Sequence, residues 1–212
     1  MKAVWYTKTG NASDVLQIGE LDDPLPNVGE VLVKIKTSGV NPSDVKIRAG
    51  ARGELQFPRV IPHSDGGGEI VDVGEGVDKN RIGERVWIWN GAFGRADGTC
   101  AELISLPEFQ AVKINNEVSY ESAACMGIPA STAYYGLLAN GPIKNKTVLI
   151  SGGAGAVGFY GIQIAKLSGA NVITTISNDE KAEIANNAGA DKIINYKKEN
   201  ILKEVMKYTE NN

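Results

Sequence analysis

The chain has 212 residues, of which 42% are apolar and 22% are charged, and its formal net charge at pH 7 is -3. This is the composition of one or two folded domains, and its slightly acidic balance does not favour nucleic-acid or membrane-surface binding. No apolar run approaches the roughly 20 residues of a membrane span, and the first ten residues lack a signal-peptide core. A cytoplasmic protein without nucleic-acid or membrane partners is expected.

The first half of the chain shows the period-2 alternation of short strands. Residues 3–6, 30–40, 68–77 and 85–90 alternate apolar with polar side chains, and residues 100–106 resemble a further strand. Short strands at this spacing, separated by Gly and Asn turns, predict a small all-β barrel or sandwich. The 25 glycines are not periodic, and their clusters beside apolar runs predict tight turns.

The composition changes near residue 119. Residues 119–139 are rich in alanine, with apolar residues at helical spacing, and Ser119 is a candidate cap at the start. Pro129 is expected to break or kink this helix. The predicted domain boundary lies here, between residues 120 and 121.

From residue 147 the chain alternates between predicted strands and helices. Gly169 and Gly189 are expected to end the first two helices. The order β-α-β-α-β-α predicts a parallel sheet with crossover helices. The expected strands are 147–152, 171–177 and 191–196, and the expected helices are 156–169, 179–189 and 198–209.

A glycine turn, "SGGAGAVG" at residues 151–158, contains the pattern G-x-G-x-x-G between a predicted strand and helix. Gly153 permits the tight turn, Gly155 lets a pyrophosphate approach, and Gly158 lets the helix pack on the strand. Helix N-terminal amides then bind the anion. The alternative is a purely structural turn. The candidate cofactor-binding residues of the turn are Ser151, Gly153, Gly155, Ala156, Val157 and Gly158.

The end of the second strand of this unit indicates which dinucleotide binds. NAD sites place a carboxylate there for the ribose 2′-hydroxyl, but here Asp179 and Glu180 come later, where they start the next helix. The hydroxyl of Ser177 and the cation of Lys181 suit a 2′-phosphate, and Tyr196 can stack or hydrogen-bond at the same end. We therefore predict NADP(H). In the alternative, Lys181 is a solvated helix residue and Tyr196 a surface aromatic.

Several longer stretches carry a family resemblance through nearly the whole chain, in one order. They are residues 29–50, 61–77, 81–87, 98–103, 131–137, 151–158 and 188–196. Through them the chain resembles the medium-chain dehydrogenase/reductase superfamily, and most of all its zinc-independent quinone oxidoreductase, or zeta-crystallin-like, branch. The resemblance implies an α/β fold with a β-rich domain: a GroES-like barrel at residues 1–120, then a partial Rossmann domain at 121–212.

The resemblance also bears on metal dependence. In the zinc branch, a Cys ligand occupies the position of Asn41 and a His ligand that of Ser64; the single histidine of this chain, His63, lies one position away. Zinc needs three or four convergent ligands, so no metal is expected. His63 is then a turn residue.

Three further residues are assigned through the same resemblance. Asn41 is expected to orient the substrate carbonyl through its amide. Ser43 matches the hydroxyl that relays a proton in the zinc branch, and its alternative role is a cap before Asp44. Thr132 resembles the threonine that contacts the nicotinamide, and the alternative is an ordinary helix hydroxyl.

The activity implied is NADPH-dependent, metal-independent reduction of a quinone or an α,β-unsaturated carbonyl (enone) by hydride transfer. The alternatives are an enoyl-thioester reductase and a non-catalytic NADPH-binding or truncated, inactive product. Family members continue past residue 212, so we expect a C-terminally truncated chain with only the first half of the Rossmann domain. The homodimer of intact members uses a later edge strand, which this sequence does not reach.

Overall fold

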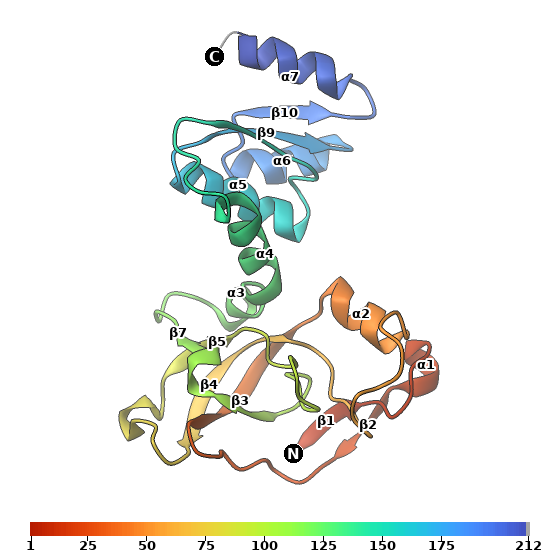
Figure 1. The fold of residues 1–212 in the computed structure, drawn as a ribbon, viewed down its shortest axis with the longest axis vertical. Coiled ribbons are helices and arrows are strands. Elements are labelled where there is room, and N and C mark those ends of the chain that lie inside the picture. The colour runs from red at the N-terminus through yellow and green to blue at the C-terminus, as the bar shows by residue number, and fades with distance from the viewer. Residues whose placement is uncertain (211–212) are drawn as a thin grey trace. The chain divides into compact units, whose positions relative to one another are not determined.

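The protein, described here by a computed structural model covering residues 1–210, consists of two compact units. The first is Met1–Ile128 and the second begins at Pro129 (Figure 1). This division falls inside a helix, after the boundary predicted between residues 120 and 121. Each unit has its own hydrophobic core, so each is described separately.

The first unit is built on antiparallel strands, as the alternating sequence predicts. Its main sheet has five strands in the order β6-β3-β4-β5-β7, and a second sheet pairs β1 with β2. Two of these strands, β2 and β7, are not predicted, because neither of the short sequences QIGE and AVK alternates apolar with polar residues. The strands are β1 (Lys2–Trp5), β2 (Gln17–Glu20), β3 (Glu30–Gly39), β4 (Asp65–Val73), β5 (Arg85–Ile88), β6 (Leu103–Pro107) and β7 (Ala111–Lys113).

Alternation along these strands places one set of apolar side chains in a common core. Val31 and Val33 on β3 contribute to it with Ile70 on β4, and all three are fully buried. Ile104 on β6 packs in the same cluster. The core therefore follows directly from the period-2 pattern of the sequence.

The clustering of glycines predicts a turn at residues 66–68. In the structure these residues are instead part of strand β4. A Cβ on Gly67 would lie 2.7 Å from the carbonyl oxygen of Tyr120, and one on Gly68 would collide with the carbonyl oxygen of Lys34. These glycines permit close approach of neighbouring backbone, which sequence alone does not separate from a turn.

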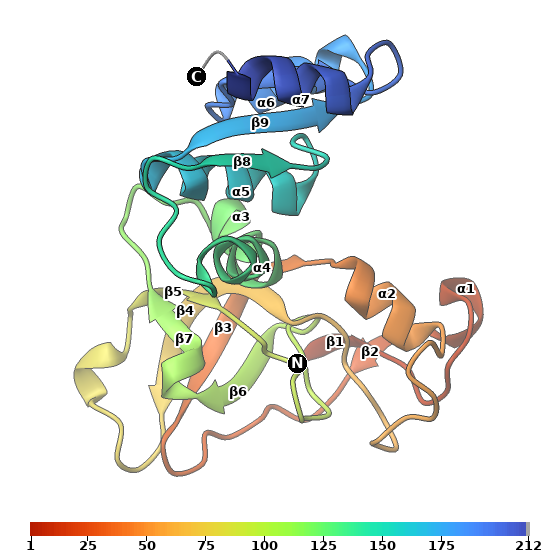
Figure 2. The same cartoon turned by 45° about the horizontal axis from the view of Figure 1, so that its top comes forward.

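The helices of the first unit are short. Helix α2 (Pro42–Arg48), which is not among the predicted helices, follows β3 directly and lies beside α1 (Ala12–Val15) (Figures 1 and 2). Two 3-10 turns, Lys79–Arg81 and Glu108–Gln110, lie in the connections between strands.

The helix predicted over 119–139 is divided into α3 (Tyr120–Ala124) and α4 (Gly127–Leu138). Ser119 caps α3 by accepting a hydrogen bond from the Ser122 N–H at 3.1 Å. Pro129 does not break the helix, because it lies in the first turn of α4, where a backbone N–H has no helical acceptor.

The second unit confirms the predicted β-α-β-α-β-α order. Its three strands are parallel, in the order β10-β9-β8, and helix α5 packs against β8 and β9 (Figure 2). Gly169 and Gly189 have positive φ after α5 and α6, as expected of residues that end helices. The elements are β8 (Thr147–Ile150), α5 (Ala156–Leu167), β9 (Asn171–Ile176), α6 (Asp179–Asn187), β10 (Lys192–Asn195) and α7 (Ile201–Glu210).

The core of this unit lies between the sheet and the helices that follow β8 and β9. Ile162 and Ala165 of α5 pack there with Val172 of β9 and Ala185 of α6, and all four are fully buried. Within residues 1–210, no helix combines the length and the apolar character needed to cross a membrane.

A pair of adjacent substitutions on β4 tests the assignment of the core. Ile70 is fully buried, whereas Val71 is 37% exposed. Ile70→Ala should lower the free energy of unfolding by about 2–5 kcal/mol, because it leaves a cavity, and Val71→Ala by less than about 1 kcal/mol. All three tryptophans, Trp5, Trp87 and Trp89, lie in the first unit, so urea unfolding followed by tryptophan fluorescence reports on it. Equal losses would contradict the assignment.

Candidate functional site

The glycine turn connects β8 with α5 and is tied to the neighbouring strand. The N–H of Gly152 donates to Thr175 Oγ1, and the N–H of Gly153 to the Thr175 carbonyl, both at 3.1 Å. Gly155 is the N-cap of α5, with φ -80° and ψ 160°. The turn is therefore held at the carboxyl edge of the parallel sheet, where α/β proteins bind ligands.

Two of the three motif glycines are required by packing. A Cβ on Gly153 would collide with Thr174 Oγ1, and one on Gly158 with the Gly152 carbonyl oxygen. A Cβ on Gly155 would meet only the Gly152 carbonyl oxygen, at 3.3 Å, and Gly155 is exposed. Packing within the protein therefore restricts position 155 less than positions 153 and 158, as expected where a ligand approaches the backbone.

The remaining predicted residues of the turn face solvent. Ser151, Ala156 and Val157 are exposed, and the backbone N–H groups in the first turn of α5 have no acceptor within the helix. Together with the helix dipole, these groups form a site suited to an anion.

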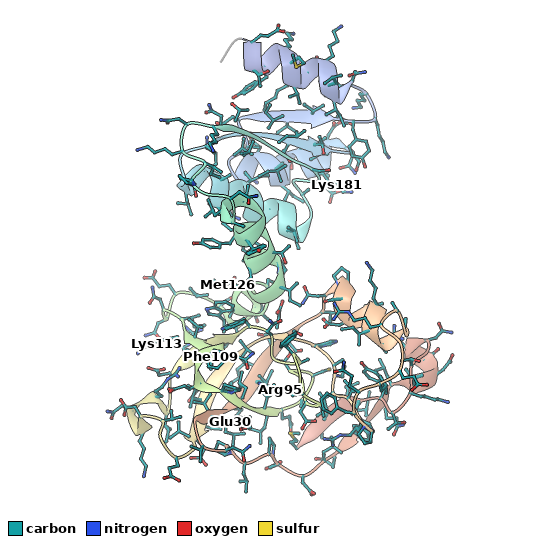
Figure 3. The ribbon with its side chains drawn as sticks, in the orientation of Figure 1. Glu30, Arg95, Phe109, Lys113, Met126 and Lys181 are labelled. Atoms are coloured by element: carbon teal, nitrogen blue, oxygen red, sulfur yellow. The ribbon has the colours of Figure 1, made fainter. Side chains whose placement is uncertain are left out.

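The predicted 2′-phosphate residues are brought together at the ends of β9 and β10. Lys181 Nζ donates to Ser177 Oγ at 3.1 Å, and Lys181 lies in the first turn of α6 (Figure 3). Tyr196 is half exposed and follows β10, and its N–H donates to the Ile176 carbonyl at 3.1 Å. Tyr196 and Ser177 therefore lie at the ends of adjacent strands.

The carboxylate next to this group is itself paired. Asp179 Oδ1 lies 3.5 Å from Lys198 Nζ, and both side chains are largely exposed. Lys198 is a second cation at this edge that the sequence reasoning does not include. Exposed pairs of this kind contribute little to stability, so their effect is on the local charge.

In the first unit, Asn41 lies at the N-terminus of α2. Its backbone N–H donates to Asp44 Oδ2 at 2.7 Å, and the Asp44 N–H donates to the Asn41 carbonyl at 3.0 Å. Its side-chain Nδ2 donates to Asp65 Oδ2 at 2.8 Å. Asn41 is 5% exposed, so its amide is held in one orientation by a buried carboxylate.

Asp65 is the centre of this polar cluster and is missed by the sequence reasoning. Its carboxylate also accepts the Ile128 N–H, at 2.9 Å from Oδ2, and so caps the first turn of α4. Burial raises the pKa of the Asp65 carboxyl to about 6, although the hydrogen bonds from Ile128 and Asn41 oppose this shift. The only sequence signal is an acidic residue just before the glycine run.

The other two predicted catalytic residues lie in different environments. Ser43 Oγ is buried and, within residues 1–210, has no hydrogen-bond partner. Thr132 is exposed on α4. Asn41 and Ser43 belong to the first unit and Thr132 to the second, and the roles of all three remain predictions.

Two family models match most of the chain. A model of the alcohol dehydrogenase GroES-like domain matches residues 27–116, and a model of zinc-binding dehydrogenases matches residues 156–212. The two matches fall in the two units described above and together cover more than two thirds of the chain.

Individual relatives agree with these matches. Human quinone oxidoreductase is 28% identical over 98% of this chain and 62% of its own length. The 2-methylene-furan-3-one reductase of Solanum lycopersicum is 35% identical over 94% of this chain and 53% of its own. The crystal structure of Escherichia coli quinone oxidoreductase complexed with NADPH has a TM-score of 0.82 and 29% identity, over 99% of this chain and 63% of that one. The chain thus spans about three fifths of the length of the quinone oxidoreductases.

A GroES-like β unit followed by a parallel α/β unit with a glycine turn after its first strand is the architecture of a dehydrogenase. The chain belongs to the medium-chain dehydrogenase/reductase superfamily, and the relatives described above are oxidoreductases.

The side chains near Asn41 do not fit a zinc ion. Asn41 and Asp65 bind each other, Asp44 accepts from the backbone, and within residues 1–210 no three His, Cys, Asp or Glu side chains group closely enough to hold a metal. Zinc sites need three or four convergent ligands.

The raised pKa of Asp65 predicts a pH-dependent stability. Because this carboxyl has a higher pKa in the folded chain than its ordinary value of 3.8, its contribution to stability is present below about pH 4 and is lost as the pH rises through about 6. The free energy of unfolding of the wild type, relative to that of Asp65→Asn, should therefore fall by up to about 3 kcal/mol across this range.

The measurement is urea unfolding of both proteins by tryptophan fluorescence at a series of pH values. The difference between the two proteins isolates Asp65 from the other titrating groups. A difference that stays constant between pH 4 and pH 7 would show that the Asp65 pKa is not raised.

Proposed function

We propose that this protein catalyses NADPH-dependent reduction of a quinone or an α,β-unsaturated carbonyl without a metal ion. The proposal rests on two features at the same edge of the sheet: the exposed glycine turn after β8 and the contact between Lys181 and Ser177 after β9. The end of β9 itself carries no carboxylate of the kind that binds the ribose of NAD. The NADPH complex of the Escherichia coli relative supports the choice of cofactor. The reductase from Solanum lycopersicum supports an enone as acceptor.

The chain would bind NADPH through groups of the second unit. Ala156 and Val157 are exposed in the first turn of α5, where N–H groups have no acceptor within the helix and are suited to the pyrophosphate. Lys181 and Ser177 would bind the 2′-phosphate by charge-assisted hydrogen bonds, and Tyr196 would contact the same end. Bound NADPH supplies a hydride, and the protein supplies position and electrostatics.

The first unit would orient the acceptor. One N–H of the Asn41 amide donates to Asp65, which leaves its second N–H for the carbonyl oxygen of an acceptor. Since Asp44 and Asp65 both hold Asn41 in place, the donor is preorganised, the condition under which such groups favour charge development on oxygen. Ser43 and Thr132 are assigned by family resemblance to proton relay and to contact with the nicotinamide.

Lys181→Ala tests the cofactor assignment. Loss of one charge-assisted hydrogen bond should weaken NADPH binding about tenfold and leave NADH binding unchanged, because NADH has no 2′-phosphate. Nicotinamide fluorescence titration measures both affinities. Lys146→Ala is the matched control, since Lys146 is exposed and precedes β8 at the opposite edge of the sheet. Equal loss for both cofactors in Lys181→Ala would contradict 2′-phosphate recognition.

The activity itself is tested by following NADPH oxidation at 340 nm with a benzoquinone, a 2-alkenal and an enoyl thioester. Turnover of the quinone or the alkenal, unaffected by a metal chelator, is expected. Turnover of the thioester alone would favour an enoyl-thioester reductase. Binding of NADPH without turnover of any acceptor would instead indicate a non-catalytic NADPH-binding protein.

A further inference from the structure

His63, the single histidine of the chain, lies just before β4 in a left-handed backbone conformation with φ +76°. Non-glycine residues adopt this region infrequently, and a residue held there is a reason to look for a function. The proposed function assigns His63 no role.

His63 is one end of a hydrogen-bonded chain of side chains. His63 Nδ1 lies 2.9 Å from Ser38 Oγ, and Ser38 Oγ lies 2.9 Å from Thr99 Oγ1. Thr99 Oγ1 lies 2.6 Å from the main-chain carbonyl oxygen of Asp65. The chain therefore ends on a group that can only accept.

The protons in this chain can be placed by counting. The Asp65 carbonyl cannot donate, so the single hydroxyl proton of Thr99 points to it. Ser38 must then donate its only proton to Thr99. The hydrogen bond between Ser38 Oγ and His63 Nδ1 then needs a proton from the ring. His63 Nδ1 is therefore protonated and donates to Ser38.

The other ring nitrogen is left free. Within residues 1–210, Nε2 makes no hydrogen bond, and the buried side-chain polar atoms without partners are Ser43 Oγ, Arg95 Nη1 and Asn195 Nδ2. Nε2 is not among them, and His63 is only partly buried, so this nitrogen is not sealed from solvent. Burial lowers the pKa of the His63 ring, although the nearby Asp44 carboxylate opposes this. The ring is thus neutral near pH 7, and Nε2 is a lone-pair acceptor.

We propose that His63 Nε2 is a hydrogen-bond acceptor for the hydroxyl group of a phenolic or enolic ligand, bound beside Asn41 and Asp44. The hydroquinone formed from a quinone carries such a hydroxyl, and so does the enol formed when hydride adds to an enone, so the ligand class rests on the proposed function. Asp65 connects the two groups, because its carboxylate accepts from the Asn41 amide and its main-chain carbonyl ends the hydrogen-bonded chain that begins at His63. His63 would therefore be a residue that binds the reduced form of the acceptor and distinguishes hydroxyl-bearing ligands from their ethers.

The single histidine makes a direct test possible. In the full chain labelled with 15N-histidine, NMR at pH 7.5 should show Nδ1 protonated and Nε2 unprotonated. Hydroquinone should then shift the Nε2 resonance, whereas its dimethyl ether, which cannot donate, should not. An Nε2–H tautomer, the same response to both compounds, or no response to hydroquinone would overturn the proposal. The tautomer readout needs neither a ligand nor turnover, so its failure is distinct from failure of the proposed function, which the NADPH oxidation assay tests separately.

Two variants separate binding from folding. His63→Gly places glycine at a positive φ, where glycine is unstrained, so it should fold as well as the wild type and bind hydroquinone about fivefold more weakly, the effect of one neutral hydrogen bond. Ser38→Ala keeps the ring but removes the acceptor for Nδ1, so its NMR spectrum should show loss of the fixed Nδ1–H tautomer. Unchanged hydroquinone affinity in His63→Gly, or an unchanged tautomer in Ser38→Ala, would contradict the proposal.

Discussion

The buried carboxylate of Asp65 is the interaction on which the first unit depends. Asp65 begins β4, and its side chain binds both the Asn41 amide at the start of α2 and the Ile128 N–H at the start of α4. Three segments far apart in sequence are therefore positioned by one group. A buried carboxylate is costly unless its oxygens are hydrogen-bonded, and its raised pKa shows that the hydrogen bonds offset only part of the cost of burial.

The main-chain carbonyl of the same residue ends the chain of hydroxyls that reaches His63. Asp65 thus fixes two side chains proposed to contact the ligand, Asn41 through its carboxylate and His63 through its backbone. Both are preorganised before any ligand arrives, which reduces the cost of ordering them on binding. The two contacts also use different atoms of Asp65, so a change to its side chain acts on Asn41 and leaves the backbone acceptor in place.

The second unit is governed by a different constraint, the geometry of parallel strands. Because β8, β9 and β10 run in one direction, their carboxyl ends meet at one edge. That edge collects the glycine turn after β8, Ser177 and Lys181 after β9, and Tyr196 after β10. The packing of Gly153 and Gly158 brings the turn close to β9 and α5, while Gly155 is left open to solvent.

Sequence by itself determined the second unit almost completely, because strand, glycine turn and helix are local patterns and the parallel order follows from their succession. It also determined the strand core of the first unit, where alternation selects Val31, Val33 and Ile70. The sequence did not distinguish the glycines of β4 from glycines in turns. Glycine is needed in β4 because backbone from residues distant in sequence lies against it, and a local pattern does not reveal this. Only the tertiary structure decided the polar cluster around Asp65 and the protonated nitrogen of His63, because hydrogen bonds between residues 24 to 63 positions apart leave no periodic signal in the chain.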